Sequence, residues 1–572
     1  NKNKFLKLTK KSHVPGITIF SDMSDWNPSE IIGNNPNLLD YSLYDYLVMK
    51  NSWHKGRSIL GYQNVNPYSL MIQFGNKPYV DVRGSFNSLI PSNLPKKLKT
   101  KLMHFYIKKL SEFPHLHDKV EFEILFSCYD VTLDNRLKEL RRYNFSKNEI
   151  LILKTSLIKL TNKIISDFPN LNVKCNNSLA KMHLRRNLLI SELDKSSKNH
   201  KNILKIVSKL LRDCHHFGTL QFVSMARIAF ISSILLKSLE TKGKIPSSTV
   251  ASLMSSLSTP LTEIQNDVMA FHEKRMAKKS FLEKYGHLRP GTYDITAPRY
   301  DMSTQLFDNI TFHKSKSHKE KVEIHFFNIL IQKLPINFTK INFLDFFSKS
   351  IVQREKIKFE FTKNMSLAIE LIADTGTILG FTREEISHLD INTILSSQKL
   401  SKIAVQKLWR TKIKYNKQKK IYGDFLSLPP LLYSIDDFEI IQYPISKPNF
   451  VTDKKISSKL INLKNTNKRI SSLKNSIVLI ENADPGYDWI FSLEPSGLIT
   501  KYGGVASHMA IRCAEIGLPA AIGCGELLYE KLSFASTIMI DCFNKEILIL
   551  EQPKNDDFEE ERKTLKSLGY IK

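Results

Sequence analysis

Cysteine is scarce in this sequence, and no two cysteines stand at the spacing of a metal-binding pair. Six of the 572 residues are cysteine, and none forms a C-x-x-C motif. This excludes a disulfide-built scaffold and a zinc site of that type. The opening segment "NKNKFLKLTKKSHVPG" has no apolar signal-peptide core, and no run of about 18 uninterrupted apolar residues occurs. We therefore expect a cytoplasmic protein with no metal site and no membrane partner.

Acidic residues are the second shortage. The chain has 56 Asp and Glu against 84 Lys and Arg, which gives a formal net charge of +28. The excess is mostly lysine spread along the chain, whereas nucleic-acid proteins concentrate basic residues in a stripe with arginine and aromatic partners. Dispersed charge usually marks a solvated surface. We therefore expect no nucleic-acid partner, although a basic protein suits phosphorylated small molecules.

The hydrophobic periodicity changes along the chain and divides it into five parts. Residues 1–94 mix short helices with a hairpin across "FGNK", and residues 95–449 are mainly helical. Residues 450–476 are rich in Lys, Ser and Asn and predict a linker. Residues 477–552 alternate strands with helices, as in a small α/β domain, and residues 553–572 form a charged tail. The expected fold class is α+β multidomain, with a mostly α-helical central domain, a small β-hairpin part and a C-terminal α/β domain.

The stretch "TKYGGVASHMAIRCAEIGLPAAIG" (500–523) carries the clearest chemical signal. Gly503-Gly504 permits the tight turn that leaves a strand, and Ser507 is a good N-cap for a helix that stops at the next glycine. His508 then stands at the first helical position. There the unpaired backbone N–H groups and the helix dipole favour an anion.

This position suits a histidine that carries a phosphoryl group as a covalent intermediate. The helix start disfavours the imidazolium and so leaves a nitrogen lone pair free to attack. The hydroxyls of Thr500 and Ser507 can stabilise the phosphoryl charge. Spacing alone leaves two other interpretations open. In the first, His508 has no chemical role and simply lies at a helix start after a Gly-rich turn. In the second, it binds a metal, although no carboxylate or cysteine stands at a familiar ligand spacing from it.

The stretch resembles the signature of the phosphohistidine swivelling domain of PEP-utilising enzymes, which include phosphoenolpyruvate synthase, pyruvate phosphate dikinase and rifampicin phosphotransferase. The arginine that usually precedes the glutamate of the pattern is replaced by Ala514, and Arg512 stands two positions earlier. The matching positions are Gly503, Gly504, Ser507, His508, Glu515, Gly517, Pro519 and Ala520. The resemblance implies that His508 is the catalytic residue, within a phosphohistidine loop of Thr500, Gly503, Gly504, Ser507 and Arg512.

A second stretch, "YGHLRPGTYDITAPRYD", resembles the element Y-G-H-R-x-x-x-E-x-D-I-x-x-P-R-W in the central domain of phosphoenolpyruvate synthase-like and rifampicin phosphotransferase proteins. It matches at His287, Arg289, Asp294 and Arg299, while Tyr300 replaces the tryptophan. Two arginines and a histidine on one rigid loop can bind a carboxylate or a phosphoryl group. Alternatively, they tie the loop down. The four matching residues are our candidates for binding the acceptor of the phosphoryl group.

Arg83 is a further acceptor-binding candidate. In "YVDVRGSFNSLIP", Arg83, Ser85 and Asn87 alternate with apolar residues. Such alternation is typical of a strand with one polar face. These side chains either line a polar pocket or form the wet face of that strand.

Together with "SDWNPSEIIG" and "KPYVDVRGSFNSLIP", these elements most resemble one branch of the family, the L-glutamine kinases of bacterial capsular phosphoramidate biosynthesis. The resemblance implies that ATP phosphorylates His508 with release of AMP and phosphate. The swivelling domain then carries the phosphoryl group to the amide nitrogen of L-glutamine, with residues 450–476 as its tether. Two alternatives stay open, namely another family acceptor (pyruvate or an antibiotic hydroxyl) and a non-catalytic phosphocarrier module.

The family uses an ATP-grasp domain to bind Mg-ATP, and the sequence shows no motif of such a domain. The only Gly-rich cluster is the histidine motif, and no Gly-rich strand-loop-strand with a lysine precedes residue 95. The chain also begins with Asn1 and not with methionine. We therefore expect the ATP-grasp domain upstream of Asn1 or on a partner chain.

Overall fold

The computed structural model describes residues 1–10, 17–23, 27–50, 52–66, 69–302, 327, 330–424, 426, 428–439, 447–463, 473–483, 485–504 and 507–551. These residues form two compact units. Described residues up to 439 belong to the first unit and those from 447 to the second, apart from 485–486, which group with the first. The expected α+β multidomain fold is confirmed.

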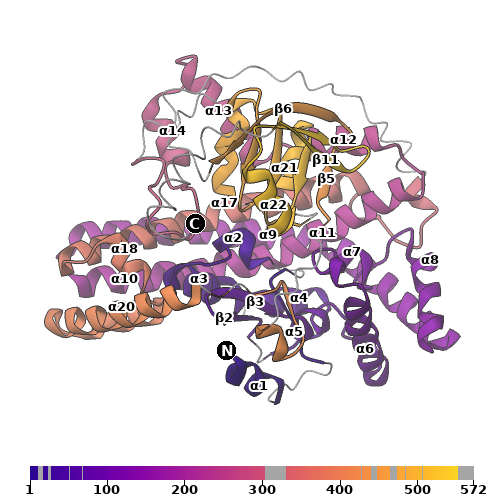
Figure 1. Cartoon of the computed structure of the whole chain (residues 1–572), viewed down its shortest axis with the longest axis horizontal. Coiled ribbons are helices and arrows are strands. Elements are labelled where there is room, and N and C mark those ends of the chain that lie inside the picture. Colours follow the sequence, from indigo (N-terminus) through magenta and orange to yellow (C-terminus); the bar gives the residue numbers. More distant parts are fainter. Residues whose placement is uncertain are drawn as a thin grey trace, which may run out of the picture. The chain divides into compact units, whose positions relative to one another are not determined.

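Three helices form the centre of the first unit. α17 (Phe343–Leu379) lies against α10 (His200–Asp213) and α11 (Leu220–Thr241), and all three contribute to one hydrophobic core (Figure 1). The Asn342 side chain accepts the backbone N–H of the third residue of α17, as an N-cap does. Gly380 ends the helix in the left-handed conformation, with φ 78°. Local capping thus fixes both ends of the helix on which the unit is assembled.

The other helices of this unit surround that centre, and the longest of them is α9 (Lys147–Lys195). A capping box starts α9, because Ser146 and Glu149 each accept the other's backbone N–H. The remaining α-helices are α1 (Lys2–Lys10), α2 (Pro28–Ile32), α3 (Leu38–Tyr44), α4 (Ser52–Leu60), α5 (Val82–Asn87), α6 (Lys96–Glu112), α7 (Val120–Glu123), α8 (Leu133–Leu137), α12 (Ser247–Ser255), α13 (Pro260–His272), α14 (Lys278–Tyr285), α18 (Arg383–Ser387), α19 (Ile391–Ser396) and α20 (Lys402–Asp424). Short 3₁₀ or π turns are η1 (Asp45–Met49), η2 (Pro114–Leu116), η3 (Lys138–Tyr143), η4 (Cys214–Thr219), η5 (Ser397–Lys399) and η6 (Asp436–Phe438). The mainly helical character predicted for this region is confirmed.

A small antiparallel sheet completes the first unit, with strand order β2-β3-β1-β4. The hairpin predicted across "FGNK" is confirmed, because Phe74 stands opposite Lys77 at its turn. The outer strand β4 comes from far along the chain and pairs with β1. The strands are β1 (Phe20–Ser21), β2 (Met71–Phe74), β3 (Lys77–Asp81) and β4 (Leu431–Leu432).

The segment after β3 corrects the sequence analysis, because Arg83, Ser85 and Asn87 lie on the helix α5 and not on a strand. Asp81 causes the change, since its carboxylate accepts the backbone N–H of Arg83 at 3.0 Å and caps the helix directly after the strand. All three side chains are buried. They are therefore not the wet face of a strand.

The second unit is built around a seven-stranded sheet of order β11-β10-β6-β7-β8-β9-β5. The four neighbours β6, β7, β8 and β9 run parallel, while β10, β11 and β5 add antiparallel pairs at the two ends. The α/β character predicted from residues 477–552 is confirmed. The elements are β5 (Asn449–Val451), β6 (Lys455–Asn462), β7 (Ile477–Ile480), the 3₁₀ helix η9 (Pro485–Leu493), β8 (Gly497–Thr500), α21 (His508–Ile516), β9 (Ala520–Ile522), α22 (Gly525–Ser533), β10 (Thr537–Asp541) and β11 (Glu546–Glu551).

The linker prediction for residues 450–476 is wrong over β5 and β6. β6 pairs with β10 on one side and with β7 on the other. Its first half, "KISSK", alternates between exposed and half-buried side chains, and only Leu460 and Ile461 are buried. A strand held mainly by backbone hydrogen bonds gives little apolar signal, which is why composition suggested a linker. Residues 464–472 and the tail 553–572 lie outside the described residues.

One helical segment, His200–Thr241, is long and apolar enough to cross a membrane by length and composition. In the fold, 67% of its most apolar window is buried inside the protein. A core helix passes the same test of length and composition. This segment is therefore only weak evidence for a membrane span.

We predict that the second unit depends on the apolar side chains of its central strands. Leu479 on β7 is fully buried, whereas Leu548 on the edge strand β11 is 46% exposed. Leu479→Ala should lower the free energy of unfolding by about 2–5 kcal/mol because it leaves a cavity, and Leu548→Ala should change it by about 1 kcal/mol or less. Hydrogen exchange of the β7 and β8 amides in the full chain, followed against urea, measures both. Equal effects of the two substitutions would contradict this account.

Candidate functional site

The histidine of the sequence motif begins a helix, as predicted. Ser507 is the N-cap of α21, and its hydroxyl accepts the backbone N–H of Ala510 at 3.2 Å. Gly517 ends the helix in the left-handed conformation, with φ 66°. His508 is therefore the first helical residue, and its side chain is largely buried at 9% exposure. The position combines the unpaired N–H groups of a helix start with a buried imidazole.

Two glycines let the backbone of the motif close on itself. Gly503 adopts φ 142°, and a Cβ at Gly523 would lie 2.2 Å from the carbonyl oxygen of Gly503. Only glycine fits such a close approach. Thr500, at the end of β8, reinforces it, because its hydroxyl accepts the backbone N–H of Gly523 at 3.0 Å. Thr500 is fully buried, and this hydrogen bond gives its side chain a place in holding the loop.

The imidazole of His508 has a partner that the sequence analysis missed. Its Nε2 lies 2.8 Å and 2.9 Å from the two carboxylate oxygens of Asp488 on η9. Asp488 stands 20 positions earlier in the chain, in a segment whose sequence predicts only a helical turn. Nothing in its spacing pointed to the contact, which arises from the packing of η9 on α21. No group of three or more His, Cys, Asp or Glu side chains is placed to hold a metal ion anywhere in the described part of the chain.

Arg512 follows His508 by four positions and therefore lies on the same face of α21. Its guanidinium is 1% exposed, and its Nη1 donates to the carboxylate of Glu515. Its Nε and Nη2 are buried and have no hydrogen-bond partner among the described residues. The ring centroid of Phe491, on η9, is 5.7 Å from its central carbon. Buried donors without acceptors are costly, so Arg512 is placed to receive an anion.

Comparison with known families identifies the region that contains this geometry. Residues 473–545 match the family model described as "PEP-utilising enzyme, mobile domain". No curated protein matches the chain. The mobile domain is a phosphohistidine-type phosphotransfer module, and its family consists generally of phosphotransferase enzymes. The matched range includes η9, the Gly-Gly turn and α21.

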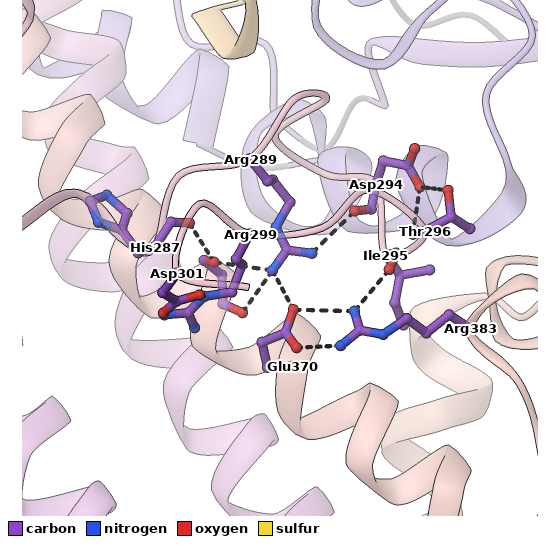
Figure 2. A network of polar contacts seen from close by, with 10 residues as sticks. His287, Arg289, Asp294, Ile295, Thr296, Arg299, Asp301, Glu370 and Arg383 are labelled. Atoms are coloured by element: carbon purple, nitrogen blue, oxygen red, sulfur yellow. Dashed lines mark hydrogen bonds and ion pairs between the residues drawn. The ribbon is translucent and has the colours of Figure 1, made fainter. Parts of the chain in front are cut away.

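The second motif, in the first unit, is built around a buried carboxylate that the sequence analysis also missed. Glu370 on α17 accepts a hydrogen bond from Nη2 of Arg289 at 2.7 Å and is also paired with Arg383 (Figure 2). Burial acts to raise the pKa of Glu370, but the hydrogen bond from Arg383 and the charges of both arginines outweigh it and lower the pKa. The carboxylate is therefore ionised and compensates two cations.

Arg289 also bonds the loop to α17. Its Nη1 donates to the carbonyl oxygen of Asp294 at 3.1 Å, and its Nη2 donates to the hydroxyl of Ser366 at 3.1 Å (Figure 2). The Ser366 hydroxyl in turn donates to the carbonyl oxygen of His287 at 2.7 Å. Both terminal nitrogens of Arg289 are thus engaged within the protein. This geometry favours the interpretation that Arg289 ties the loop down.

The side chains of Asp294 and Arg299 contact residues two positions away, within the same loop. The carboxylate of Asp294 accepts the backbone N–H and the hydroxyl of Thr296 at 2.8 Å and 2.7 Å. Arg299 forms an ion pair with Asp301, and their side chains are 17% and 31% exposed (Figure 2). Arg299 is therefore more accessible than Arg289, whose side chain is 1% exposed.

His287 points away from the Glu370 network (Figure 2). Its ring packs edge-on against Phe359 at 4.8 Å between centroids, and its buried Nε2 has no hydrogen-bond partner in the described ranges. Burial lowers the pKa of His287 well below its ordinary value, and the charges of Lys363, Arg299 and Arg186 act in the same direction. The imidazole is therefore neutral at pH 7. A neutral, buried imidazole nitrogen can accept a hydrogen bond from a bound molecule, and its lowered pKa makes it a weak base.

Arg83 lies apart from this loop in the sequence and is held by Asp81. Its Nη2 and Nε donate to the two carboxylate oxygens of Asp81 at 2.9 Å and 3.3 Å. Arg83 is 3% exposed. The described contacts therefore give Arg83 a place in the start of α5, and its role in acceptor binding stays a prediction.

We predict that Glu370 is needed for the stability of the first unit. Glu370→Gln leaves the buried Arg289 without its counter-charge and should lower the free energy of unfolding by about 3–5 kcal/mol. Asp301→Asn removes the partner of the more exposed Arg299 and should cost about 1 kcal/mol or less. The measurement is hydrogen exchange of α17 in the full chain against urea. An effect of Glu370→Gln as small as that of Asp301→Asn would show that the network does not hold the loop.

Proposed function

We propose that this chain is a phosphotransferase in which His508 accepts a phosphoryl group from ATP and passes it to the amide nitrogen of L-glutamine. The observation that carries the proposal is the position of His508 within the mobile domain, at the start of α21 and four residues before Arg512. The buried Nε and Nη2 of Arg512 lack partners among the described residues and would bond the phosphoryl oxygens. The resemblance to L-glutamine kinases supports the acceptor, and pyruvate or an antibiotic hydroxyl is the alternative within the family.

The first half-reaction transfers the β-phosphoryl group of ATP to His508. The imidazole nitrogen forms a bond to phosphorus, the bond from phosphorus to the α–β bridging oxygen breaks, and AMP leaves. Hydrolysis of the resulting pyrophosphoryl group releases phosphate and leaves phosphohistidine. In this proposal an ATP-grasp domain, upstream or on another chain, binds Mg-ATP. The reason is that the sequence has no Gly-rich nucleotide-binding motif, the histidine motif being its only Gly-rich cluster. A phosphocarrier module that exchanges with a separate enzyme is the non-catalytic alternative.

The second half-reaction takes place at the loop of the first unit. The amide nitrogen of glutamine forms a bond to phosphorus, the bond from phosphorus to His508 breaks, and the amide loses a proton. In this proposal Nε2 of His287 takes this proton as the bond to phosphorus forms, because the amide nitrogen becomes acidic at that point and a base of lowered pKa can then accept its proton. Arg299 binds the α-carboxylate and Asp294 the ammonium group. We prefer Arg299 to Arg289 for this role, since Glu370 and Ser366 occupy Nη2 of Arg289 and only its buried Nε lacks a partner among the described residues.

We predict that His508 is the phosphorylated residue. His508→Ala should abolish labelling when the chain, together with its ATP-grasp domain, is incubated with ATP labelled at the β-phosphate. His104→Ala, at an exposed position on α6, should label like the wild type. Mass spectrometry under alkaline conditions locates the acid-labile phosphoryl group. Labelling that survives in His508→Ala would refute the assignment and with it the proposed mechanism.

We predict that Arg299 and Asp294 bind the acceptor and do not act in the first half-reaction. Arg299→Ala and Asp294→Ala should each lower transfer to glutamine by about 2–4 kcal/mol, or about 30- to 1,000-fold, while His508 is still labelled at the wild-type rate. The measurements are transfer of label from phosphohistidine to glutamine and labelling of His508 itself.

Asp301→Ala is the control for a structural role of Arg299. It breaks the same ion pair but leaves the guanidinium, so it should retain transfer. Loss of transfer in Asp301→Ala as large as in Arg299→Ala would show that the ion pair only shapes the loop. Unchanged transfer in Arg299→Ala and Asp294→Ala would refute the acceptor site.

A further inference from the structure

The 3₁₀ helix η9 lies over the first turns of α21 and contacts it at two points. Asp488 meets the imidazole of His508, and Phe491, three residues later, meets the guanidinium of Arg512. Residues three apart share a face of a 3₁₀ helix, and residues four apart share a face of an α-helix. The two contacts therefore form one interface, in which the carboxylate of Asp488 lies against the imidazole of His508.

Asp488 is largely buried at this interface. Its side chain is 14% exposed and that of His508 is 8% exposed. Both carboxylate oxygens lie within hydrogen-bond distance of the same ring nitrogen. The carboxylate therefore covers Nε2 from the side on which an incoming group would approach.

A phosphoryl group bound to Nε2 cannot share this arrangement. Its oxygens would stand where the carboxylate oxygens now lie, and like charges at such distances repel strongly where water is scarce. Arg512 has the opposite relation to the same group. Its Nε and Nη2, which have no partner within the described residues, gain acceptors when an anion arrives on this face of α21.

We propose that Asp488 is a charge-sensitive latch on His508, an inference that rests on the proposed function and adds a conformational step to it. In the unphosphorylated protein its carboxylate holds Nε2 and keeps η9 on α21. In this closed state Nε2 carries a proton, which the carboxylate accepts in a hydrogen bond. During the reaction Asp488 withdraws, the ring gives the proton of Nε2 to water, and Nδ1 holds the one proton of the neutral ring. The lone pair of Nε2 then forms the bond to phosphorus as the bond from phosphorus to the donor breaks, and the phosphoryl group occupies the place that Asp488 left. Phosphorylation of His508 thereby releases η9.

The variant Asp488→Asn separates charge from shape. Its amide is nearly isosteric with the carboxylate and can still hydrogen-bond to the imidazole, but it does not repel a phosphoryl group. Glu494→Gln is the matched control, because Glu494 directly follows η9 and pairs with Lys474 at 3.3 Å. The same chemical change is thus made beside η9 without touching His508.

The experiment uses potassium phosphoramidate, which phosphorylates histidine directly and needs no nucleotide domain. In wild type and Glu494→Gln, phosphorylation should raise the hydrogen-exchange rates of the η9 amides by about tenfold or more, because the segment opens. In Asp488→Asn, phosphorylation should change these rates by about twofold or less, and labelling should be several-fold faster than in wild type, since no carboxylate opposes the anionic reagent. Phosphorus NMR and mass spectrometry identify the modified nitrogen and residue, with His508→Ala as the blank.

Three results would overturn the latch. They are unchanged exchange of η9 in phosphorylated wild type, slower labelling in Asp488→Asn, and phosphorylation at Nδ1 with η9 still closed. Slower labelling would mean that Asp488 assists the reaction as a base. Failure of the proposed function gives a different result, because His508 would then not be labelled from ATP in the presence of the nucleotide domain, whatever phosphoramidate does. The two ideas can therefore fail separately.

Discussion

The geometry of the mobile domain depends on the close approach of two backbone segments at Gly503 and Gly523. A Cβ at Gly523 would lie 2.2 Å from the carbonyl oxygen of Gly503, which is shorter than any contact that a side chain tolerates. This approach brings the turn after β8 against the end of β9, so the start of α21 has a fixed position on the sheet. His508 inherits that position, and so do Arg512 and the surface on which η9 lies. The glycine pair of the motif is thus a packing requirement as well as a turn.

A single buried carboxylate has a similar place in the first unit. Glu370 compensates Arg289 and Arg383, and Arg289 bonds the backbone of the loop that follows α14. An uncompensated charge at this depth would destabilise the unit by several kcal/mol. The network therefore separates the residues of the second motif, "YGHLRPGTYDITAPRYD", into two groups. Arg289 holds the loop, whereas the side chains of Arg299 and His287 lie outside the network. Arg299 is more exposed, and Nε2 of His287 has no partner among the described residues, so these two side chains suit the proposed acceptor site.

The sequence predicted the features that local physics determines. Ser507 and Gly517 marked the ends of α21, because N-caps and left-handed C-caps act within a few residues. The hairpin turn after Phe74 and the alternation of strands and helices in residues 477–552 followed from short-range periodicity. Contacts between residues far apart in the sequence could not be predicted from these local patterns. Asp488 and Glu370 belong to helices whose patterns predict only a turn and a core helix, and their partners stand 20 and 81 positions away.

Two errors in the secondary structure have different origins. Residues 455–462 carry few buried side chains, so the strand β6 is stabilised by its two neighbours and not by its own composition. Residues 82–87 alternate like a strand, but the carboxylate of Asp81 starts a helix there. In the first case a polar sequence becomes a central strand because the pairing partners are available. In the second case one capping side chain decides between two periodicities.

The buried donors of Arg512 that lack partners among the described residues bear on the energetics of the proposed phosphohistidine. Each buried donor without an acceptor costs about 1–3 kcal/mol, so the unphosphorylated domain is destabilised at this point and a bound phosphoryl group would relieve it. A carrier must not bind its cargo too tightly, because the second transfer has to remove it. Glu515 limits the gain, since its carboxylate already neutralises part of the guanidinium through Nη1. Arg512 can therefore stabilise a phosphoryl group on His508 without trapping it, which is the balance that a transferable intermediate needs.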